Sequence, residues 1–122
     1  MLRHRITTAG VAGALTLAIA VPALAHTEVK STSPKRGGTA STAIKSVKVT
    51  FEGRIRSGTL TVRKVGGGKV SVGSGRRDPR SVRRLVVGLK SGLAAGRYKA
   101  NWKMIAADGH EQKGSFRFRL ER

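Results

Sequence analysis

Cysteine is absent from the 122 residues, and aromatic side chains make up only 4% of them. Without cysteine, the chain can form neither a disulfide framework nor a thiolate metal site. With so few aromatic rings, it offers no obvious platform on which the bases of a single-stranded nucleic acid could stack. Acidic residues are also scarce, six against 25 basic ones, which leaves a formal net charge of +19. This charge predicts attraction to polyanions such as nucleic acid, anionic lipid or an acidic wall polymer.

The length and the apolar content point to one folded domain. A globular domain typically has about 100–200 residues, so 122 residues leave room for one. Hydrophobic residues make up 39% of the chain, and Val and Leu recur regularly along it. That content argues against a fully disordered chain in spite of the charge. We find no internal repeat and no second domain.

Residues 1–25 have the layout of a cleavable secretory signal peptide. A short basic head at residues 3–5 precedes an apolar run, Ala9–Leu24, and the segment ends in the small-x-small sequence Ala23-Leu24-Ala25. The alternative is an uncleaved membrane anchor. The apolar run is shorter than the roughly 20 residues that a spanning helix needs, which favours cleavage. We therefore predict export, to the periplasm or the cell exterior.

Cleavage after Ala25 would make His26 the first residue of a mature domain that spans residues 26–122. Removing 25 of the 122 residues leaves 97 and takes away two of the 25 basic residues and none of the acidic ones, so the mature net charge is +17. An N-terminal histidine carries a free amine and an imidazole, which together can chelate a metal. The amine has an unperturbed pKa of only about 7.7–8.0, so a metal can displace its proton at neutral pH.

The mature chain shows the period-2 alternation of β-strands and little helical periodicity. Apolar residues alternate with polar ones in five runs: Val47/Val49/Phe51, Leu60/Val62, Val70/Val72, Tyr98/Ala100/Trp102/Met104 and Phe116/Phe118/Leu120. The denser run Leu85-Val86-Val87 is typical of a strand that is buried on both faces or lies near the centre of the core. These runs predict six or seven short strands.

Turn residues separate the predicted strands. We expect an early loop at 33–38, a hairpin connection at 66–68, a mobile surface loop at 73–79 and a tight turn at Asp108-Gly109. Gly96-x-Tyr98 is typical of the turn that places a buried tyrosine at the corner of a sandwich. The fold that we predict is therefore all-β: a Greek-key antiparallel β-sandwich of the immunoglobulin-like kind with about seven strands, preceded by a signal-peptide helix.

After cleavage only two histidines remain, and both occupy positions suited to metal binding. His26 supplies two nitrogens, and the Asp108-Gly109-His110 turn can aim a carboxylate and an imidazole to the same side. Three nitrogens and one oxygen suit square-planar or tetragonal Cu(II), while Zn(II) would take a similar set in tetrahedral form. Because the imidazoles must be neutral, affinity should fall as the pH drops through about 6. The alternative is a common Asp-Gly turn beside a surface histidine, since only the fold can bring His26 and His110 together.

Several segments of the sequence resemble the copper-resistance protein C (CopC) family. His26 followed by Ser31-Thr32-Ser33-Pro34 is similar to the start of the mature family members, and 47–52 is similar to the next strand. The C-terminal half carries the most specific resemblance, in Leu93-x-x-Gly96-x-Tyr98-x-Ala100-x-Trp102, Ala107-Asp108-Gly109-His110 and Gly114-Ser115-Phe116-x-Phe118. The resemblance spans residues 26–120.

This resemblance implies a periplasmic or secreted copper carrier with a seven-stranded Greek-key sandwich. It also implies a Cu(II) site made of the His26 amine and Nδ1, Asp108 and His110. Some relatives add a Cu(I) site in a methionine-rich loop. Here Met104 is the only methionine left after cleavage, and its alternation with Trp102 indicates the core. We therefore expect binding of Cu(II) only, and Glu52 is more simply a solvated strand residue than a support for the site.

Three functions can be compared on the sequence. The first is a Cu(II) carrier or buffer in copper homeostasis or resistance, with the copper ion and a membrane copper importer as partners. The alternative is a basic exported domain that binds an anionic envelope polymer or a membrane surface, with no specific nucleic acid partner. An enzyme is disfavoured, because two histidines without cysteine give no convincing nucleophile–base set. A carboxylate ligand should also favour Cu(II) and resist reduction.

Overall fold

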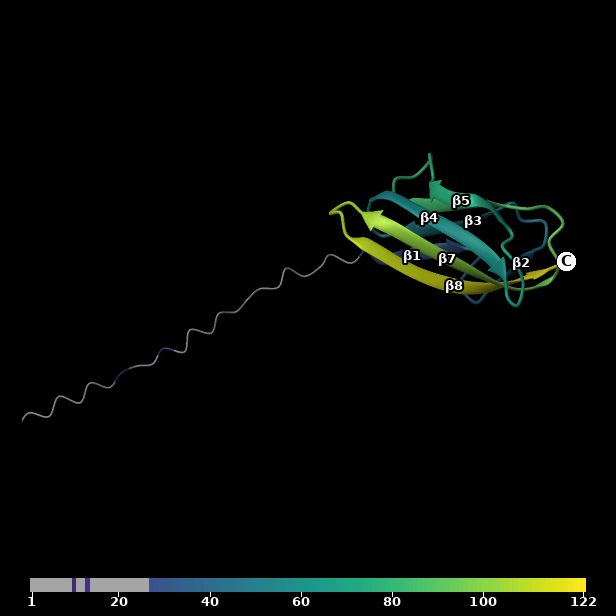
Figure 1. The fold of residues 1–122 in the computed structure, drawn as a ribbon, viewed down its shortest axis with the longest axis horizontal. Coiled ribbons are helices and arrows are strands. Elements are labelled where there is room, and N and C mark those ends of the chain that lie inside the picture. Colours follow the sequence, from purple (N-terminus) through teal and green to yellow (C-terminus); the bar gives the residue numbers. More distant parts are fainter. Residues whose placement is uncertain (1–9, 11–12, 14–26) are drawn as a thin grey trace, which may run out of the picture.

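The structure is a computed structural model that describes residues 10, 13 and 27–122. Eight strands make up the domain: β1 (Val29–Ser33), β2 (Thr39–Ser41), β3 (Ser46–Phe51), β4 (Ile55–Lys64), β5 (Ser71–Arg77), β6 (Arg84–Leu89), β7 (Gly96–Ala106) and β8 (Glu111–Glu121). They form two four-stranded sheets, in the orders β1-β3-β6-β5 and β2-β8-β7-β4. Figure 1 shows the two layers, with β4, β7 and β8 side by side in one of them. The predicted all-β sandwich is confirmed.

The core lies between the two sheets and is built from the alternating runs that the sequence displays. Among the described residues, fifteen hydrophobic ones are buried: Val47, Val49, Phe51, Ile55, Leu60, Val62, Leu85, Val87, Tyr98, Ala100, Met104, Ala106, Phe116, Phe118 and Leu120. Residues i and i+2 of a strand share a face, so all of these runs except Val70/Val72 place their apolar side chains inward and their polar ones outward. In β6 the outward-facing Val86 is only half-buried between the fully buried Leu85 and the nearly buried Val87.

The corner expected at Tyr98 is present. Its side chain is 1% exposed, and its hydroxyl donates a hydrogen bond to the carbonyl oxygen of Ala94. The ring stacks on Phe118 of β8 with 5.8 Å between the ring centroids. Burial raises the pKa of the Tyr98 hydroxyl. The bond gives this buried phenol the partner that it needs in a dry environment, and it fixes the entry into β7.

Two details of strand order differ from the expectation of about seven antiparallel strands. The three-residue β2 is an eighth strand, too short to leave an alternating signal. It also pairs with the end of β8 in parallel, with Ala40 opposite Leu120. The remaining strand pairs are antiparallel.

The expected loop at 73–79 was wrong, because residues 71–77 form β5. The backbone of β5 passes so close to β4 that a Cβ on Gly75 would lie 2.8 Å from the Leu60 carbonyl oxygen. Gly75 also has a φ of +70°, which a residue with a side chain rarely adopts. The glycine and arginine content that suggested a loop therefore serves a close crossing of two strands.

The inward face expected for Val72 was also wrong. Val72 is 61% exposed, whereas Ser71 is 2% exposed and its hydroxyl accepts a hydrogen bond from the Val62 N–H at 2.9 Å. The register between β5 and β6 shifts between Val72 and Arg76. Val72 precedes this shift and lies opposite the exposed Gly88, so it belongs to the outer face, and alternation alone assigned this strand the wrong side.

The predicted signal peptide and its helix lie outside the described residues. In the described part of the chain, no helix has the length and apolar character needed to cross a bilayer.

Candidate metal centre

The connection between β7 and β8 is a tight turn at one end of the sandwich, away from the labelled C-terminus (Figure 1). The Ala106 N–H donates to the His110 carbonyl oxygen at 2.8 Å, and the Gly109 N–H donates to the Ala106 carbonyl oxygen at 2.9 Å. Gly109 has a φ of +91°, so the turn requires a residue without a Cβ at this position. The turn predicted at Asp108-Gly109 is confirmed.

The turn brings Asp108 and His110 into direct contact. The Asp108 Oδ2 lies 2.9 Å from His110 Nδ1, and Asp108 Oδ1 accepts a hydrogen bond from the His110 N–H, also at 2.9 Å. The His110 N–H, followed by its imidazole, holds the pKa of the Asp108 carboxyl below its ordinary value. The carboxylate is therefore ionised at neutral pH, as a metal ligand must be.

Both side chains of the pair remain open to solvent, at 55% exposure for His110 and 37% for Asp108. When a neutral imidazole donates through Nδ1, its Nε2 keeps a free lone pair that can bind a metal. Among the residues that the structure describes, no group of three or more His, Cys, Asp or Glu side chains is placed to hold a metal ion. The pair thus offers one nitrogen and one oxygen, and a closed site needs ligands from elsewhere.

Residues at the start of β4 and just before it contact the turn. The Ala107 N–H donates to the Arg54 carbonyl oxygen at 3.2 Å. An ideal Cβ on Gly109 would lie 3.6 Å from Nη1 of Arg56, so a guanidinium group borders the turn. Sequence reasoning missed both arginines, because only the pairing of β4 with β7 brings them here.

Thr27 and Glu28, which directly precede β1, lie between β8 and the segment that follows β3. When the oxygen and nitrogen of the Gln112 side-chain amide are interchanged, the orientation that the hydrogen-bond network favours, the amide donates to the Thr27 carbonyl oxygen at 2.9 Å and accepts from the Thr27 N–H at 3.2 Å. This orientation gives both polar atoms of the amide a partner. A Cβ on Gly53 would lie 3.1 Å from the Thr27 hydroxyl, and the Glu52 N–H donates to the Glu28 carbonyl oxygen at 2.8 Å. Contacts on two sides thus hold Thr27 and Glu28.

Of the three predicted ligands, the structure brings together Asp108 and His110. His26 lies outside the described residues. Sequence reasoning missed Gln112, whose only signal was its place two residues after His110. Glu52 is exposed, as expected, but it follows the last residue of β3 and is not part of the strand.

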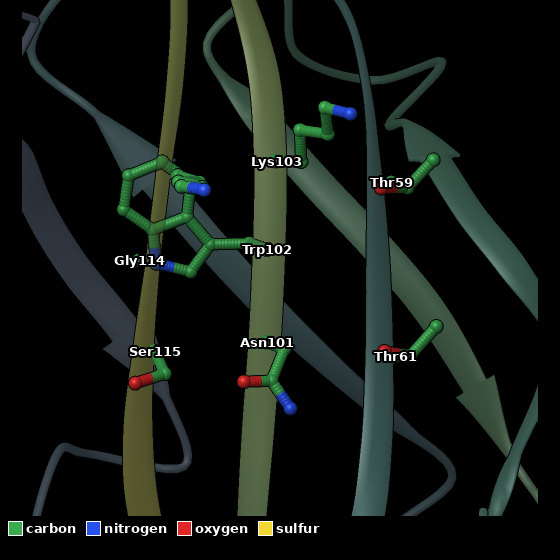
Figure 2. Close-up of a pocket in the computed structure, with 8 residues that line it drawn as sticks. Thr59, Thr61, Asn101, Trp102, Lys103, Gly114 and Ser115 are labelled. Carbon is green, nitrogen blue, oxygen red and sulfur yellow. The ribbon is translucent and has the colours of Figure 1, made fainter.

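Met104 and Trp102, which alternation assigned to the core, both face the interior of the sandwich. Met104 has no exposed surface, and Trp102 is half-buried and packs edge-to-face against Phe51 with 5.0 Å between ring centroids. Figure 2 shows the indole across Gly114 of the neighbouring strand. A Cβ on Gly114 would lie 2.5 Å from Trp102 Cζ2, so the ring occupies the space that the glycine leaves.

Comparisons with known proteins agree with this architecture. The family model of the CopC domain matches residues 29–121. Among solved structures, CopC from Methylosinus trichosporium OB3b has 23% sequence identity and a TM-score of 0.68, covering 79% of this chain and 94% of its own. PcoC, a methionine-rich copper resistance protein from Escherichia coli, has 21% identity and a TM-score of 0.64, covering 80% of this chain and 100% of its own. A search of curated proteins finds no match.

The two structures share the fold of this chain at low identity, and the family model covers the domain nearly from its first strand to its last. This chain belongs to the CopC domain family.

Proposed function

We propose that this protein is an exported Cu(II) carrier or buffer that works outside the cytoplasm in copper homeostasis or resistance. Residues 1–25 are its cleaved signal peptide, and residues 26–122 are the copper-binding domain. The ligands are the amine and imidazole of His26, the Asp108 carboxylate and the His110 imidazole. The membership in the CopC family and the likeness in fold to a protein described as a copper resistance protein support a copper-related role.

The hydrogen bonds between Gln112 and Thr27 are the observation that carries this proposal. Consecutive Cα atoms are about 3.8 Å apart, so His26 begins one such step from a residue held against β8. His110 precedes Gln112 by two positions, which is at most about 7 Å of extended chain. This placement of Thr27 supports the proposal that His26 and His110 bind the same ion.

The available donor atoms favour Cu(II) over other ions. Three nitrogens and one carboxylate oxygen suit a tetragonal site, and copper leads the affinity order of the divalent ions. A Cu(I) site would need soft sulfur ligands. The chain has no cysteine, and Met104 is fully buried.

Electrostatic steering does not favour the capture of Cu²⁺ by this domain. The mature charge is strongly positive, and the Arg56 guanidinium borders the turn. A cation therefore approaches against the field of the protein, so binding has to come from direct coordination. A carrier, rather than an enzyme, fits a site whose carboxylate ligand favours Cu(II) and resists reduction. A membrane copper importer is the delivery partner that this role implies.

Copper binding can be tested on protein that begins at His26, by isothermal titration and electron paramagnetic resonance. We expect one tetragonal, nitrogen-rich Cu(II) per chain. His26→Ala, His110→Ala and one added glycine before His26 should each weaken binding strongly, because each removes or displaces a chelating group. Glu121→Gln, which alters an exposed carboxylate at the end of β8, is the matched control and should bind as the unaltered protein does. Full binding without His110, or no binding at all, would refute the proposal.

The signal peptide has its own test. N-terminal sequencing of the exported protein should return His26-Thr27-Glu28. A mature chain that begins at any other residue lacks the amine ligand in its proposed place, and the site would then fail in this form.

A further inference from the structure

Cationic side chains gather on the outer face of the sheet β2-β8-β7-β4. Cross-strand register places Arg63, Lys99 and Arg117 in one row, Lys103 beside Lys113 in a second, and Arg97 beside Arg119 in a third. We call these seven residues the basic face. Six of them are exposed and Lys99 is half-buried, and they alternate with the inward-facing core residues of the same strands.

The basic face is nearly free of acidic partners. In the described part of the chain, the one ion pair that involves it joins Lys103 to Glu111 at 2.9 Å. Glu111 and Glu121 lie at the two ends of β8, outside the rows of cations. The other four acidic residues, Glu28, Glu52, Asp78 and Asp108, belong to other elements or turns. No carboxylate therefore interrupts the area between the ends of this face.

Placing like charges directly opposite one another has a cost for the fold. Side chains opposite each other on neighbouring strands have Cβ atoms about 4.5–5.5 Å apart, and like charges at that spacing destabilise a sheet. The row Arg63–Lys99–Arg117 repeats the unfavourable pairing twice. An external anion that spans the rows would relieve this repulsion, which makes the face a docking surface for negative charge.

The shape of the face indicates what kind of anion it suits. Between the cations lie short polar side chains, Thr59, Thr61, Asn101 and Ser115 (Figure 2). Strands about 4.8 Å apart that rise about 3.3 Å per residue spread the cations over an area, not along a line. The indole of Trp102 is half-buried and packs edge-to-face against the fully buried Phe51, so it does not stand out from the sheet as a stacking platform for bases. A broad polar face of this kind matches a charged plane better than a single polymer strand.

We propose that the basic face docks this domain on an anionic lipid bilayer, through contacts between its lysines and arginines and phosphate headgroups. The contact is peripheral, because charged and short polar side chains dominate the face. Val65, which is 43% exposed and donates its N–H to the Arg97 carbonyl oxygen, is a short side chain that cannot insert deeply between lipids. Such binding is reversible and salt-sensitive, since it depends on surface charge within a Debye length. It is a second property of the domain, separate from copper binding.

The position of the candidate metal centre is compatible with this docking. Ile105 and Glu111 form the row nearest the β7–β8 turn, and Asp108 and His110 lie beyond it. A bilayer laid against the rows of cations therefore leaves the turn at the rim of the contact. The Asp108 and His110 side chains thus stay accessible for metal exchange while the domain is bound to the membrane surface.

The test is sedimentation of metal-free residues 26–122 with vesicles of phosphatidylcholine, with and without phosphatidylglycerol. We expect binding only to the vesicles that contain phosphatidylglycerol, and release by salt. The triple variant Arg63→Gln/Lys99→Gln/Arg117→Gln should bind about 100-fold more weakly, because each basic residue near an anionic surface contributes measurably.

The matched control removes three charges from the other sheet and its loops, in Lys45→Gln/Arg76→Gln/Arg80→Gln. Its binding should fall by no more than about threefold. Those charges lie on the side of the domain that faces away from the bilayer, and salt screens the attraction between charges that are more than a Debye length apart. Equal losses in the two variants would mean that net charge alone drives adsorption, and would overturn the proposal. So would retention on heparin without any binding to phosphatidylglycerol, which would point to an acidic polymer. Circular dichroism and a thermal melt establish that both variants are folded.

Discussion

The side-chain amide of Gln112 pairs with both backbone polar atoms of Thr27, which places the neighbour of His26 beside the Asp108–His110 turn. The amide therefore helps to determine where the proposed N-terminal ligand begins. Residues that orient a ligand without touching the metal commonly matter for affinity.

Gln112→Ala should weaken Cu(II) binding by about 10–100-fold, the range typical for groups that orient a metal ligand. The affinity is measured by competition with a Cu(II) chelator, on protein that begins at His26. Gln112→Glu is the matched variant: it keeps an acceptor for the Thr27 N–H but cannot donate to the carbonyl, so we expect an intermediate loss. Unchanged affinity in both variants would mean that the amide plays no part in placing the ligand.

Replacing Met104 separates packing from metal chemistry. Because Met104 is fully buried, Met104→Leu should leave Cu(II) affinity unchanged and should lower the free energy of unfolding by less than about 1.5 kcal/mol. Competition with a Cu(I) chelator should detect no tight Cu(I) complex in either protein. A tight Cu(I) complex that Met104→Leu abolishes would contradict the burial argument.

Gly114→Ala should disturb the seat of Trp102. The added Cβ would lie 2.5 Å from the indole, and overpacking of this kind typically costs about 1–3 kcal/mol. Chemical denaturation measures the loss, and the emission maximum of Trp102 reports the movement of the ring. Gly88→Ala is the control, because its Cβ would meet only the Lys45 carbonyl oxygen, at 4.0 Å. Equal stability of the two variants would count against a steric role for Gly114.

Asp78 stabilises the fold as a carboxylate. It is 6% exposed, accepts a hydrogen bond from the Arg80 N–H at 2.9 Å and pairs with Arg84 Nε at 2.8 Å. The Arg80 N–H, together with the Arg84 guanidinium, lowers its pKa below the ordinary value of 3.8 in spite of burial. A pKa that is lower in the folded state gives stability that is present above the unfolded-state value and is lost as the pH falls through the folded-state value.

Asp78→Asn should therefore lower the free energy of unfolding at pH 7 by about 1–3 kcal/mol. The difference between variant and unaltered protein should shrink as the pH falls below 3.8. Urea denaturation at a series of pH values measures both effects. A difference that stays constant down to the lowest pH would show that the charge of Asp78 does not contribute.

The melting temperature should rise with ionic strength, because salt screens the repulsion among the cations. Calorimetry in low and high potassium chloride measures the rise. The variant Arg63→Gln/Lys99→Gln/Arg117→Gln should show a smaller rise, since it lacks the row of opposed charges. A melting temperature that falls with salt would contradict the expectation.

Much of the fold could be predicted because its strands are regular. β3, β7 and β8 alternate cleanly, and every apolar residue that alternation assigned to them is buried or half-buried. The corner at Tyr98 and the turn at Asp108-Gly109 depend on residues close in sequence. Such local relationships can be recognised without knowledge of the tertiary structure.

The alternating run at Val70/Val72 indicated only the start of β5, and the rest could not be predicted because its conformation depends on a neighbouring strand. Gly75 permits a crossing at Leu60, and the Ser71 hydroxyl satisfies the N–H of Val62. Neither contact leaves a periodic signal in the sequence. The same distinction applies to the candidate site. The contact between Asp108 and His110 is local and could be predicted, whereas the role of Gln112 depends on Thr27, which is distant in sequence and adjacent only in the fold.

Because Gln112 places Thr27 beside the turn, copper binding at the neighbouring His26 would also affect the free energy of unfolding of this domain, which has no disulfide. A copper ion held by positions 26 and 110 would close a loop of roughly 85 residues, and a cross-link of that span can stabilise a fold by about 4–5 kcal/mol in the chain-entropy model. Metal and fold would then be linked, because whatever removes the ion also reopens the loop. The bound copper ion would act as a reversible cross-link, and a copper-loaded chain would resist unfolding and proteolysis better than a copper-free one.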